Sequence, residues 1–249
     1  MELRGAVAIV TGGSGGLGGR ICHALADQGT NVAVLYNTGL DQANKIVSEI
    51  SAKGVAAVPI QCDVSDQQSV SMMASKVIEA LGRIDVLVND AGYNKWIPFN
   101  DLDALTYEDW TKIFDVNLTG PMLCIKAVAP AMKSQGTGRI VNISSVAGLE
   151  PTGSSIPYAV AKSGLIHLTK CMAVGLGPEI QVNCIAPGFL LGTKMSDNLA
   201  PEYQKSAIEN SQLKRAADKD DIAKQVVTFC TSDSTTGQTL AIDSGRVFH

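Results

Sequence analysis

The residues best suited to chemistry in this sequence are a tyrosine and a lysine four positions apart, Tyr158 and Lys162. If residues 155–176 form a helix, both side chains lie on one face, one turn apart. A free tyrosine has a pKa near ~10, too high for a base at neutral pH, but a neighbouring ammonium favours the phenolate. The pair could therefore act as a general acid and base. Taken alone, this spacing is more often an exposed surface pair.

A serine hydroxyl is the second candidate group. Ser145 follows the apolar run at 139–143, which we expect to be a buried strand. In an open parallel sheet, ligands bind outside the carboxyl ends of the strands, so a hydroxyl there could hold a substrate oxygen. Ser144 is the alternative at this point.

A glycine-rich stretch supplies the third feature. It reads Thr11-Gly12-Gly13-Ser14-Gly15-Gly16-Leu17-Gly18-Gly19, and it lies between the first apolar run and a stretch of helical spacing. Glycine permits a sharp turn and a close approach of backbone to a pyrophosphate, and amides at the helix start can hold the phosphates. This context predicts a dinucleotide-binding loop. The alternative is a glycine-rich surface turn without a ligand.

The elements that must position these groups follow from the alternation of β-branched apolar runs with helical spacing. We expect one domain over residues 1–249 with a Rossmann-like, doubly wound α/β fold, a seven-stranded parallel sheet with helices on both faces. Strands are expected at 6–10, 31–36, 56–61, 84–88, 138–143, 180–185 and 239–242. Helices are expected at 17–28, 40–53, 65–81, 106–133, 155–176 and 220–230. Residues 189–217 lack a strand pattern and are expected to form a substrate lid.

Composition narrows the class of partner. The net charge of −4 gives no basic face for nucleic acid or an anionic membrane, so we expect a small-molecule partner. The six cysteines show no C-x-x-C spacing and the three histidines are isolated, so we expect neither disulfides nor a metal site. With no signal-peptide pattern at the start, a cytoplasmic setting is expected.

The ordered motifs resemble the short-chain dehydrogenase/reductase family over nearly the whole chain, in particular its 3-oxoacyl-thioester reductases and carbonyl reductases. The matching motifs are the coenzyme loop Thr11-Gly12-x-x-x-Gly16-x-Gly18, the adenine contact Asp63-Val64, the turn Asn89-Asp90-Ala91-Gly92 and the nicotinamide turn Pro187-Gly188. The family's catalytic tetrad corresponds to Asn117, Ser145, Tyr158 and Lys162, and its usual gap to the tyrosine favours Ser145 over Ser144.

The resemblance implies a nicotinamide cofactor and a homotetramer or homodimer. It also implies that Lys162 binds the nicotinamide ribose and that Asn117 steadies a water that relays the proton. The expected cofactor contacts are Gly12, Ser14, Gly15, Gly16, Leu17, Gly18, Tyr36, Asn37, Thr38, Asp63, Val64, Asn89, Ala91, Gly92, Tyr158, Lys162, Pro187, Gly188 and Thr193.

The expected reaction is the interconversion of a carbonyl and an alcohol by hydride transfer. Ser145 would fix the carbonyl, the cofactor would deliver hydride, and Tyr158 would protonate the oxygen. The expected substrate contacts are Ser145, Tyr158 and Trp96, the last as an aromatic wall. Three alternatives stay open: an NAD-dependent alcohol or polyol dehydrogenase, a dehydratase or epimerase, and a non-catalytic dinucleotide-binding scaffold.

The end of the second expected strand bears on the coenzyme. It reads Tyr36-Asn37-Thr38 and lacks the acid that binds the ribose 2′-hydroxyl of NAD, so we predict a preference for NADP. Gly15 stands where many NADP-dependent relatives carry a cation, and Arg20 or Lys45 could substitute for it. Asp90 also departs from the family pattern, in which an Asn is usual, and we interpret it as a turn-capping carboxylate.

Overall fold

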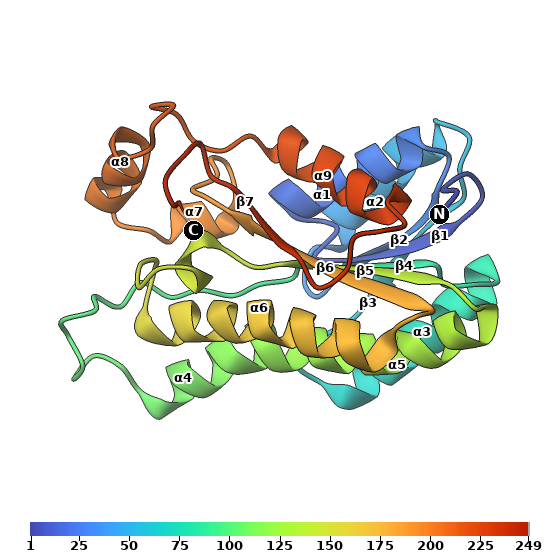
Figure 1. Cartoon of the computed structure of the whole chain (residues 1–249), viewed down its shortest axis with the longest axis horizontal. Coiled ribbons are helices and arrows are strands. Elements are labelled where there is room, and N and C mark those ends of the chain that lie inside the picture. The colour runs from blue at the N-terminus through green and yellow to red at the C-terminus, as the bar shows by residue number, and fades with distance from the viewer. Residues whose placement is uncertain (249) are drawn as a thin grey trace.

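The computed structural model describes residues 1–248 and is built on one seven-stranded parallel sheet (Figure 1). The strand order is β3-β2-β1-β4-β5-β6-β7. The strands are β1 (Val7–Thr11), β2 (Asn31–Tyr36), β3 (Ala57–Gln61), β4 (Val86–Asn89), β5 (Gly138–Ile143), β6 (Ile180–Pro187) and β7 (Thr239–Ile242). The chain reverses its direction across the sheet between β1 and β4, which is where a doubly wound sheet binds its ligand.

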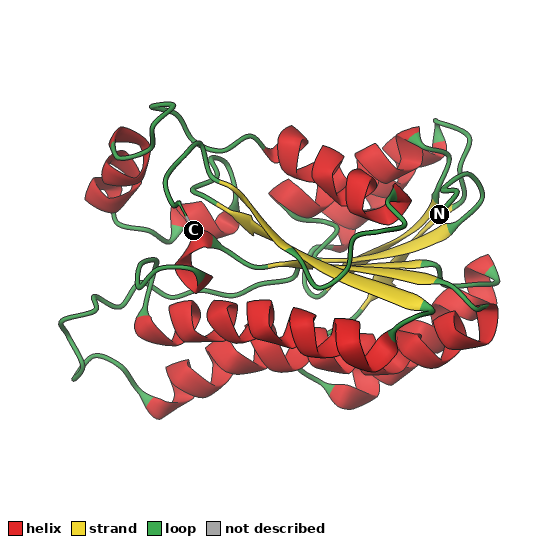
Figure 2. Ribbon diagram, viewed as in Figure 1, coloured by secondary structure: helices red, strands yellow, loops and turns green. Residues whose placement is uncertain are grey.

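Helices cover both faces of this sheet (Figure 2). One hydrophobic cluster joins the sheet to α1 (Gly16–Asp27), α2 (Leu40–Ser51) and α9 (Lys219–Thr231). A second joins the opposite face to α3 (Gln67–Leu81) and α5 (Gly120–Gln135), and α6 (Ile156–Leu176) packs on this same face against β6. Every residue of β1, β4 and β5 is buried, because neighbours cover both faces. The predicted Rossmann-like α/β fold is confirmed.

The helix expected at 106–133 is not uniform. It consists of α4 (Tyr107–Phe114), a π-helical turn at Asp115–Thr119, and α5. The buried Asn117 amide donates to the Ile113 carbonyl at 2.8 Å, four residues earlier. A side chain that takes this carbonyl competes with the backbone amide, and such wide turns are frequent at functional sites. The sequence pattern predicted the helix but not this turn.

The segment expected as a lid, 189–217, contains two short helices that the pattern did not predict. They are α7 (Lys194–Asp197) and α8 (Pro201–Glu209), and Figure 1 shows them at the end of the molecule where α6 begins. Thr193 caps α7, because its hydroxyl accepts from the Ser196 amide at 3.1 Å. Pro201 occupies the first turn of α8, where its missing amide costs nothing.

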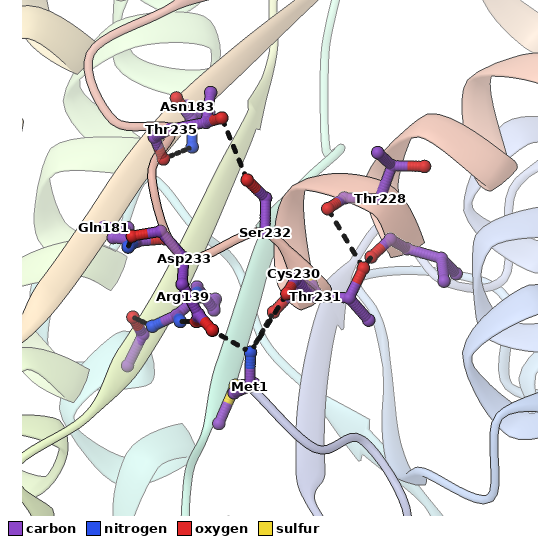
Figure 3. Close-up of polar contacts among 12 residues, drawn as sticks. Met1, Arg139, Gln181, Asn183, Thr228, Cys230, Thr231, Ser232, Asp233 and Thr235 are labelled. Carbon is purple, nitrogen blue, oxygen red and sulfur yellow. Dashed lines mark hydrogen bonds and ion pairs between the residues drawn. The ribbon is translucent and has the colours of Figure 1, made fainter.

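A polar cluster anchors the connection from α9 to β7 at the amino ends of β5 and β6 (Figure 3). Asp233 accepts from the Arg139 guanidinium at 2.7 Å and from the Met1 ammonium at 3.3 Å. Gln181 donates to the Asp233 carbonyl at 2.7 Å. Arg139 and Gln181 lie near the starts of β5 and β6, so these contacts fix the amino ends of the strands. Within residues 1–248, no helix has the length and apolarity needed to cross a membrane.

Candidate active site

A cavity of about 960 Å³ opens at the carboxyl ends of the strands. Its walls come from the glycine-rich loop after β1, the turns after β4 and β5, the start of α6, and the segment 189–217. We call this space the central cavity. Its volume suits a dinucleotide together with a small substrate.

The glycine-rich loop forms a cradle along one wall. Gly12 has a φ of +66°, and its carbonyl accepts from the Gly15 amide at 2.8 Å. A Cβ on Gly16 would lie 2.6 Å from the Gly192 carbonyl oxygen, so only glycine fits between the loop and the lid. No side chain caps the start of α1, which leaves its first amides for an anion. These features fit a bound pyrophosphate.

Gly18 has a different role from the one expected for a ligand contact. It is buried and does not line the central cavity. A Cβ there would lie 2.8 Å from the Gly12 carbonyl carbon and 2.9 Å from Asp90 Oδ2. Gly18 therefore lets α1 pack closely against its own loop and against the turn after β4.

The turn after β4 is held by groups of neighbouring strands. The Thr11 hydroxyl accepts from the amides of Asp90 and Ala91, each at 3.0 Å. Asn89 is 2% exposed, and its amide donates to Asn142 Oδ1 at 2.8 Å. Asn89 thus faces the interior of the sheet and does not line the central cavity, whereas Asp90, Ala91 and Gly92 do.

Tyr158, Lys162 and Ser145 converge on the central cavity. The Lys162 ammonium lies 5.7 Å from the centroid of the Tyr158 ring and donates to the Ile143 carbonyl at 2.9 Å. Both side chains are buried, so the pair is not an exposed surface pair. Ser144 is committed elsewhere, because its hydroxyl donates to the Lys162 carbonyl at 2.8 Å. The Ser145 oxygen accepts from the Ala147 amide at 3.2 Å, which leaves its proton for a ligand.

Burial controls the acid and base strengths of the site. It raises the pKa of the Tyr158 phenol above its usual value, and the neighbouring Ser145 hydroxyl opposes this rise. Burial lowers the pKa of Lys162 to about 8, although the Asp90 carboxylate favours the ammonium. We expected the Lys162 ammonium to lower the pKa of Tyr158, but desolvation is the largest influence on that pKa and Lys162 is not among the others.

Asp90 places a carboxyl group, which was not expected to take part in the site, on the cavity wall near Lys162. Burial raises the pKa of its carboxyl to about 7, and Lys162 is the larger of the two influences that oppose this rise, followed by the Gly18 amide. The Asp90 carboxylate therefore does more than cap a turn, because its charge and that of Lys162 influence each other's pKa. The only sign of this in the sequence is the departure from the family's usual Asn.

Asn117 does not reach the central cavity. It is 0% exposed, and its amide donates to the carbonyls of Tyr93 at 2.7 Å and Ile113 at 2.8 Å. Its carbonyl oxygen accepts from the Tyr93 amide at 3.4 Å. In this arrangement Asn117 holds the turn that carries Gly92 and Tyr93 against the π-helical turn.

The end of the cavity at β2 and β3 would hold the adenosine half of a dinucleotide. It is lined by Ser14, Asn37, Thr38, Asp63 and Val64, whereas Tyr36 lies outside the lining. Among the described residues, no lysine or arginine lines this end.

Neither cation proposed as a substitute lies there. Arg20 forms two hydrogen bonds to Asp220, at 2.7 and 2.6 Å, and Lys45 does not line the central cavity. The expectation that one of them substitutes for a cation at Gly15 is therefore wrong.

The substrate end of the cavity differs from the expectation for Trp96. Trp96 lies outside the lining and packs edge-on against Tyr203, with ring centroids 5.4 Å apart and an interplanar angle of 61°. Tyr203, from α8, lines the cavity in the place expected for Trp96, together with other aromatic residues such as Tyr93 and Phe189. Sequence reasoning also missed Arg215 and Arg246, which line it. Leu17, Pro187, Gly188 and Thr193 line the cavity as expected.

A parallel sheet whose switch point carries a glycine cradle defines a dinucleotide-binding protein of the Rossmann class. The family model described as short chain dehydrogenase matches residues 6–204. The chain therefore belongs to the short-chain dehydrogenase family of oxidoreductases.

Individual relatives agree with this assignment. The chain is 38% identical to "3-oxoacyl-[acyl-carrier-protein] reductase FabG" of Staphylococcus epidermidis over 242 residues, which cover 96% of this chain and 97% of the relative. It is similar to the crystal structure of an NADPH-dependent 3-quinuclidinone reductase of Rhodotorula rubra, with a TM-score of 0.91, 27% identity, and coverage of 98% and 92% of the two chains. An NAD+-bound xylitol dehydrogenase matches with a TM-score of 0.89, 29% identity, and coverage of 98% and 100%.

Proposed function

We propose that this chain is an NADPH-preferring reductase that interconverts a carbonyl group, in a ketone or a 3-oxoacyl compound, and a secondary alcohol. The observation that carries the proposal is the convergence of Tyr158, Lys162 and Ser145 on the same cavity as the glycine cradle. A 3-oxoacyl reductase and an NADPH-dependent ketone reductase among the similar proteins support the reaction class.

Tyr158 is the proton donor in this proposal. Because burial raises the pKa of its phenol, the side chain carries its proton throughout the neutral range, which is the form that reduction requires. The Ser145 hydroxyl donates to the substrate oxygen and stabilises the charge that develops there. The cofactor, when bound, supplies the hydride.

Lys162 stabilises the phenolate that remains after proton transfer. Its pKa of about 8 keeps it an ammonium at neutral pH, and its bond to the Ile143 carbonyl holds it 5.7 Å from the tyrosine ring. Asn117 acts as a positioning residue, since its amide fixes the turn at Tyr93 beside the cavity. Gly12, Gly15 and Gly16 would hold the pyrophosphate through backbone amides.

The preference for NADPH rests on the end of β2. Asn37, Thr38 and Ser14 can donate hydrogen bonds to a 2′-phosphate, and no carboxylate replaces Asn37 or Thr38 to repel it. Asp63 is near this end, but it accepts from the Ser65 amide and hydroxyl at 2.9 and 2.6 Å. The absence of a lysine or arginine from this end among the described residues favours the alternative, an NAD-dependent alcohol or polyol dehydrogenase.

The proposal is tested by two measurements. Initial rates over a panel of ketones, 3-oxoacyl thioesters and sugars give kcat/KM with NADPH and with NADH. A tenfold or greater preference for NADH would establish the alternative. Tyr158→Phe is expected to abolish turnover while the affinity for NADPH, measured by fluorescence titration, stays unchanged. Retained turnover in this variant would refute the assignment of Tyr158 as the proton donor. A wild-type protein that binds the dinucleotide but reduces no compound of the panel would establish the non-catalytic scaffold instead.

A further inference from the structure

Two arginines that the catalytic proposal does not use line the central cavity. Arg215 follows α8, and Arg246 follows β7, so they come from segments far apart in sequence. Hydrogen bonds hold these segments together: the Leu213 amide donates to the Ser244 carbonyl at 3.0 Å, and the Ser244 hydroxyl donates to the Ala216 carbonyl at 3.2 Å. The fold thus brings two arginines, the exposed Arg215 and the half-buried Arg246, to one part of the cavity wall.

This part of the wall adjoins the turn after β6. The Ala217 amide donates to the Phe189 carbonyl at 2.9 Å. A Cβ on Gly188 would lie 2.7 Å from the Cα of Asp243. The segments that carry Arg215 and Arg246 therefore pack directly behind the Pro187-Gly188 turn, on the substrate side of the cavity. The end at β2 and β3 is formed by other elements.

Neither guanidinium has an ion-pair partner within 4.0 Å among residues 1–248. The carboxylate closest in sequence to Arg246 is Asp243, and it accepts from the amides of Gly245 at 2.9 Å and Val247 at 2.7 Å. Outside the cavity, Arg20, Arg83 and Arg139 are each bound to an aspartate, whereas the exposed Arg4 has no ion pair among the described residues. Arg246 is half-buried, so its charge has lost part of its water without gaining a counter-ion.

We propose that Arg215 and Arg246 bind an anionic group, a carboxylate or a phosphate, on the substrate whose carbonyl is reduced. This inference rests on the proposed reductase function and names the substrate class that the site takes. A guanidinium fork matches two oxygens of either group and forms charge-assisted hydrogen bonds. Because Arg215 and Arg246 come from separate segments, both can bind the same anion. The bound anion then fixes the distance from the charged end of the substrate to the Tyr158 hydroxyl.

The test compares charged substrates with matched neutral ones. For carboxylates, kcat/KM is measured with NADPH for 3-oxobutanoate, 4-oxopentanoate and 5-oxohexanoate and for their methyl esters. For phosphates, dihydroxyacetone phosphate is compared with dihydroxyacetone. At least one anion is expected to exceed its neutral counterpart by about tenfold or more, because hydrogen bonds to charged groups are worth about this much. The pair that shows the preference identifies carboxylate or phosphate.

The variants Arg246→Met and Arg215→Met should each remove this preference. KM for the anion should rise about tenfold, while kcat and the rates with the neutral compound stay unchanged. Lys205→Met is the matched control, since Lys205 is an exposed cation on the same lid that lies 3.7 Å from Glu209 and does not line the cavity. It should leave every rate unchanged. The affinity of each variant for NADPH shows that it is folded and that the arginines do not bind the cofactor.

Isothermal titration of NADPH-loaded protein with the same anions separates this inference from the proposed function. If no carbonyl compound is reduced but the wild type binds an anion that Arg246→Met does not bind, the anion site stands and the reductase proposal fails. If ketones are reduced but charged and neutral compounds are equal, in both rate and binding, the anion site is refuted. An equal loss of rate with both kinds of compound in the variants would also refute it.

Discussion

Gly18 offers the sharpest check on the cradle, because the same substitution at another helical glycine should have the opposite effect. Gly18→Ala places a Cβ 2.8 Å from the Gly12 carbonyl carbon, where an ordinary contact is 3.4–4 Å. The overlap of at least 0.6 Å is with backbone, which cannot rotate away. Gly175→Ala, in α6, places its Cβ where no atom lies within 4 Å.

The magnitudes follow from these contacts. Alanine is favoured over glycine inside a helix by about 0.5–1 kcal/mol, so Gly175→Ala should raise the free energy of unfolding by that amount. Gly18→Ala gains the same propensity but loses about 1–3 kcal/mol to overpacking, so the net effect is a loss of up to about 2.5 kcal/mol. To relieve the overlap, the Gly12 loop must move, and its amides then no longer fit the pyrophosphate.

The assay is urea unfolding of both variants, with and without NADPH, together with titration of NADPH by fluorescence. Gly18→Ala should lose stability and bind NADPH at least about tenfold more weakly, since about 1.4 kcal/mol of lost contacts corresponds to tenfold. Gly175→Ala should gain stability and bind NADPH like the wild type. If Gly18→Ala has wild-type stability and affinity, the close packing of α1 on the loop is not what the cradle needs, and the reasoning fails.

Three further predictions concern buried polar groups. Asp90→Asn removes the carboxylate that raises the pKa of Lys162, so the pKa of Lys162 should fall below about 8. The alkaline limb of the kcat/KM pH profile should then move to lower pH. An unmoved limb would show that Asp90 does not influence the pKa of Lys162. Ser145→Ala should lower kcat about 10²–10³-fold. Ser144→Ala should keep its turnover and lower the free energy of unfolding by about 1 kcal/mol. The reverse result would make Ser144 the hydroxyl that binds the substrate oxygen. Asp85→Ala should cost about 3 kcal/mol in thermal unfolding because the buried carboxylate accepts from the Val7 amide and the Arg83 guanidinium. Loss of an exposed carboxylate such as Asp220 should cost about 0–1 kcal/mol, and equal losses would contradict the difference in burial.

The β-α alternation could be predicted from the sequence because its physical cause is local. A strand buried on both faces has to be apolar throughout, as β1 and β5 are, and a helix that packs on one face has to repeat its apolar residues every three to four positions. Three strands have the predicted bounds, namely Asn31–Tyr36, Gly138–Ile143 and Thr239–Ile242. The glycine loop could be predicted from its place between a strand and a helix, whereas the Tyr158-Lys162 spacing alone favours a surface pair and pointed to the site only together with that loop and Ser145.

The parts that escaped prediction depend on contacts between distant segments. The π-helical turn at Asn117 exists because its amide bonds to Tyr93 as well as to Ile113, and nothing in the helical pattern records the Tyr93 contact. The part of the cavity wall with Arg215 and Arg246 exists because the end of the segment 189–217 pairs with the segment that follows β7. These two segments are distant in sequence, so neither alone predicts the wall. Trp96 was placed at the cavity because its type suits a pocket, but the fold puts Tyr203 in front of it.

A division of labour between two kinds of polar residue explains why the motif residues do not all face the cavity. Asn89 donates a hydrogen bond to Asn142, and Asn117 donates one to the Tyr93 carbonyl. These two asparagines therefore hold neighbouring segments of backbone together and do not face the cavity. Tyr158 and Lys162 keep their reactive atoms at the cavity, where burial shifts both pKa values in the direction of the neutral form. A phenol that holds its proton can give it to the oxygen of a reduced carbonyl, and a nearby positive charge lowers the free energy of the phenolate that remains. In the proposed mechanism Lys162 supplies this charge, and its bond to the Ile143 carbonyl holds it near the tyrosine ring in a site where burial disfavours the ammonium.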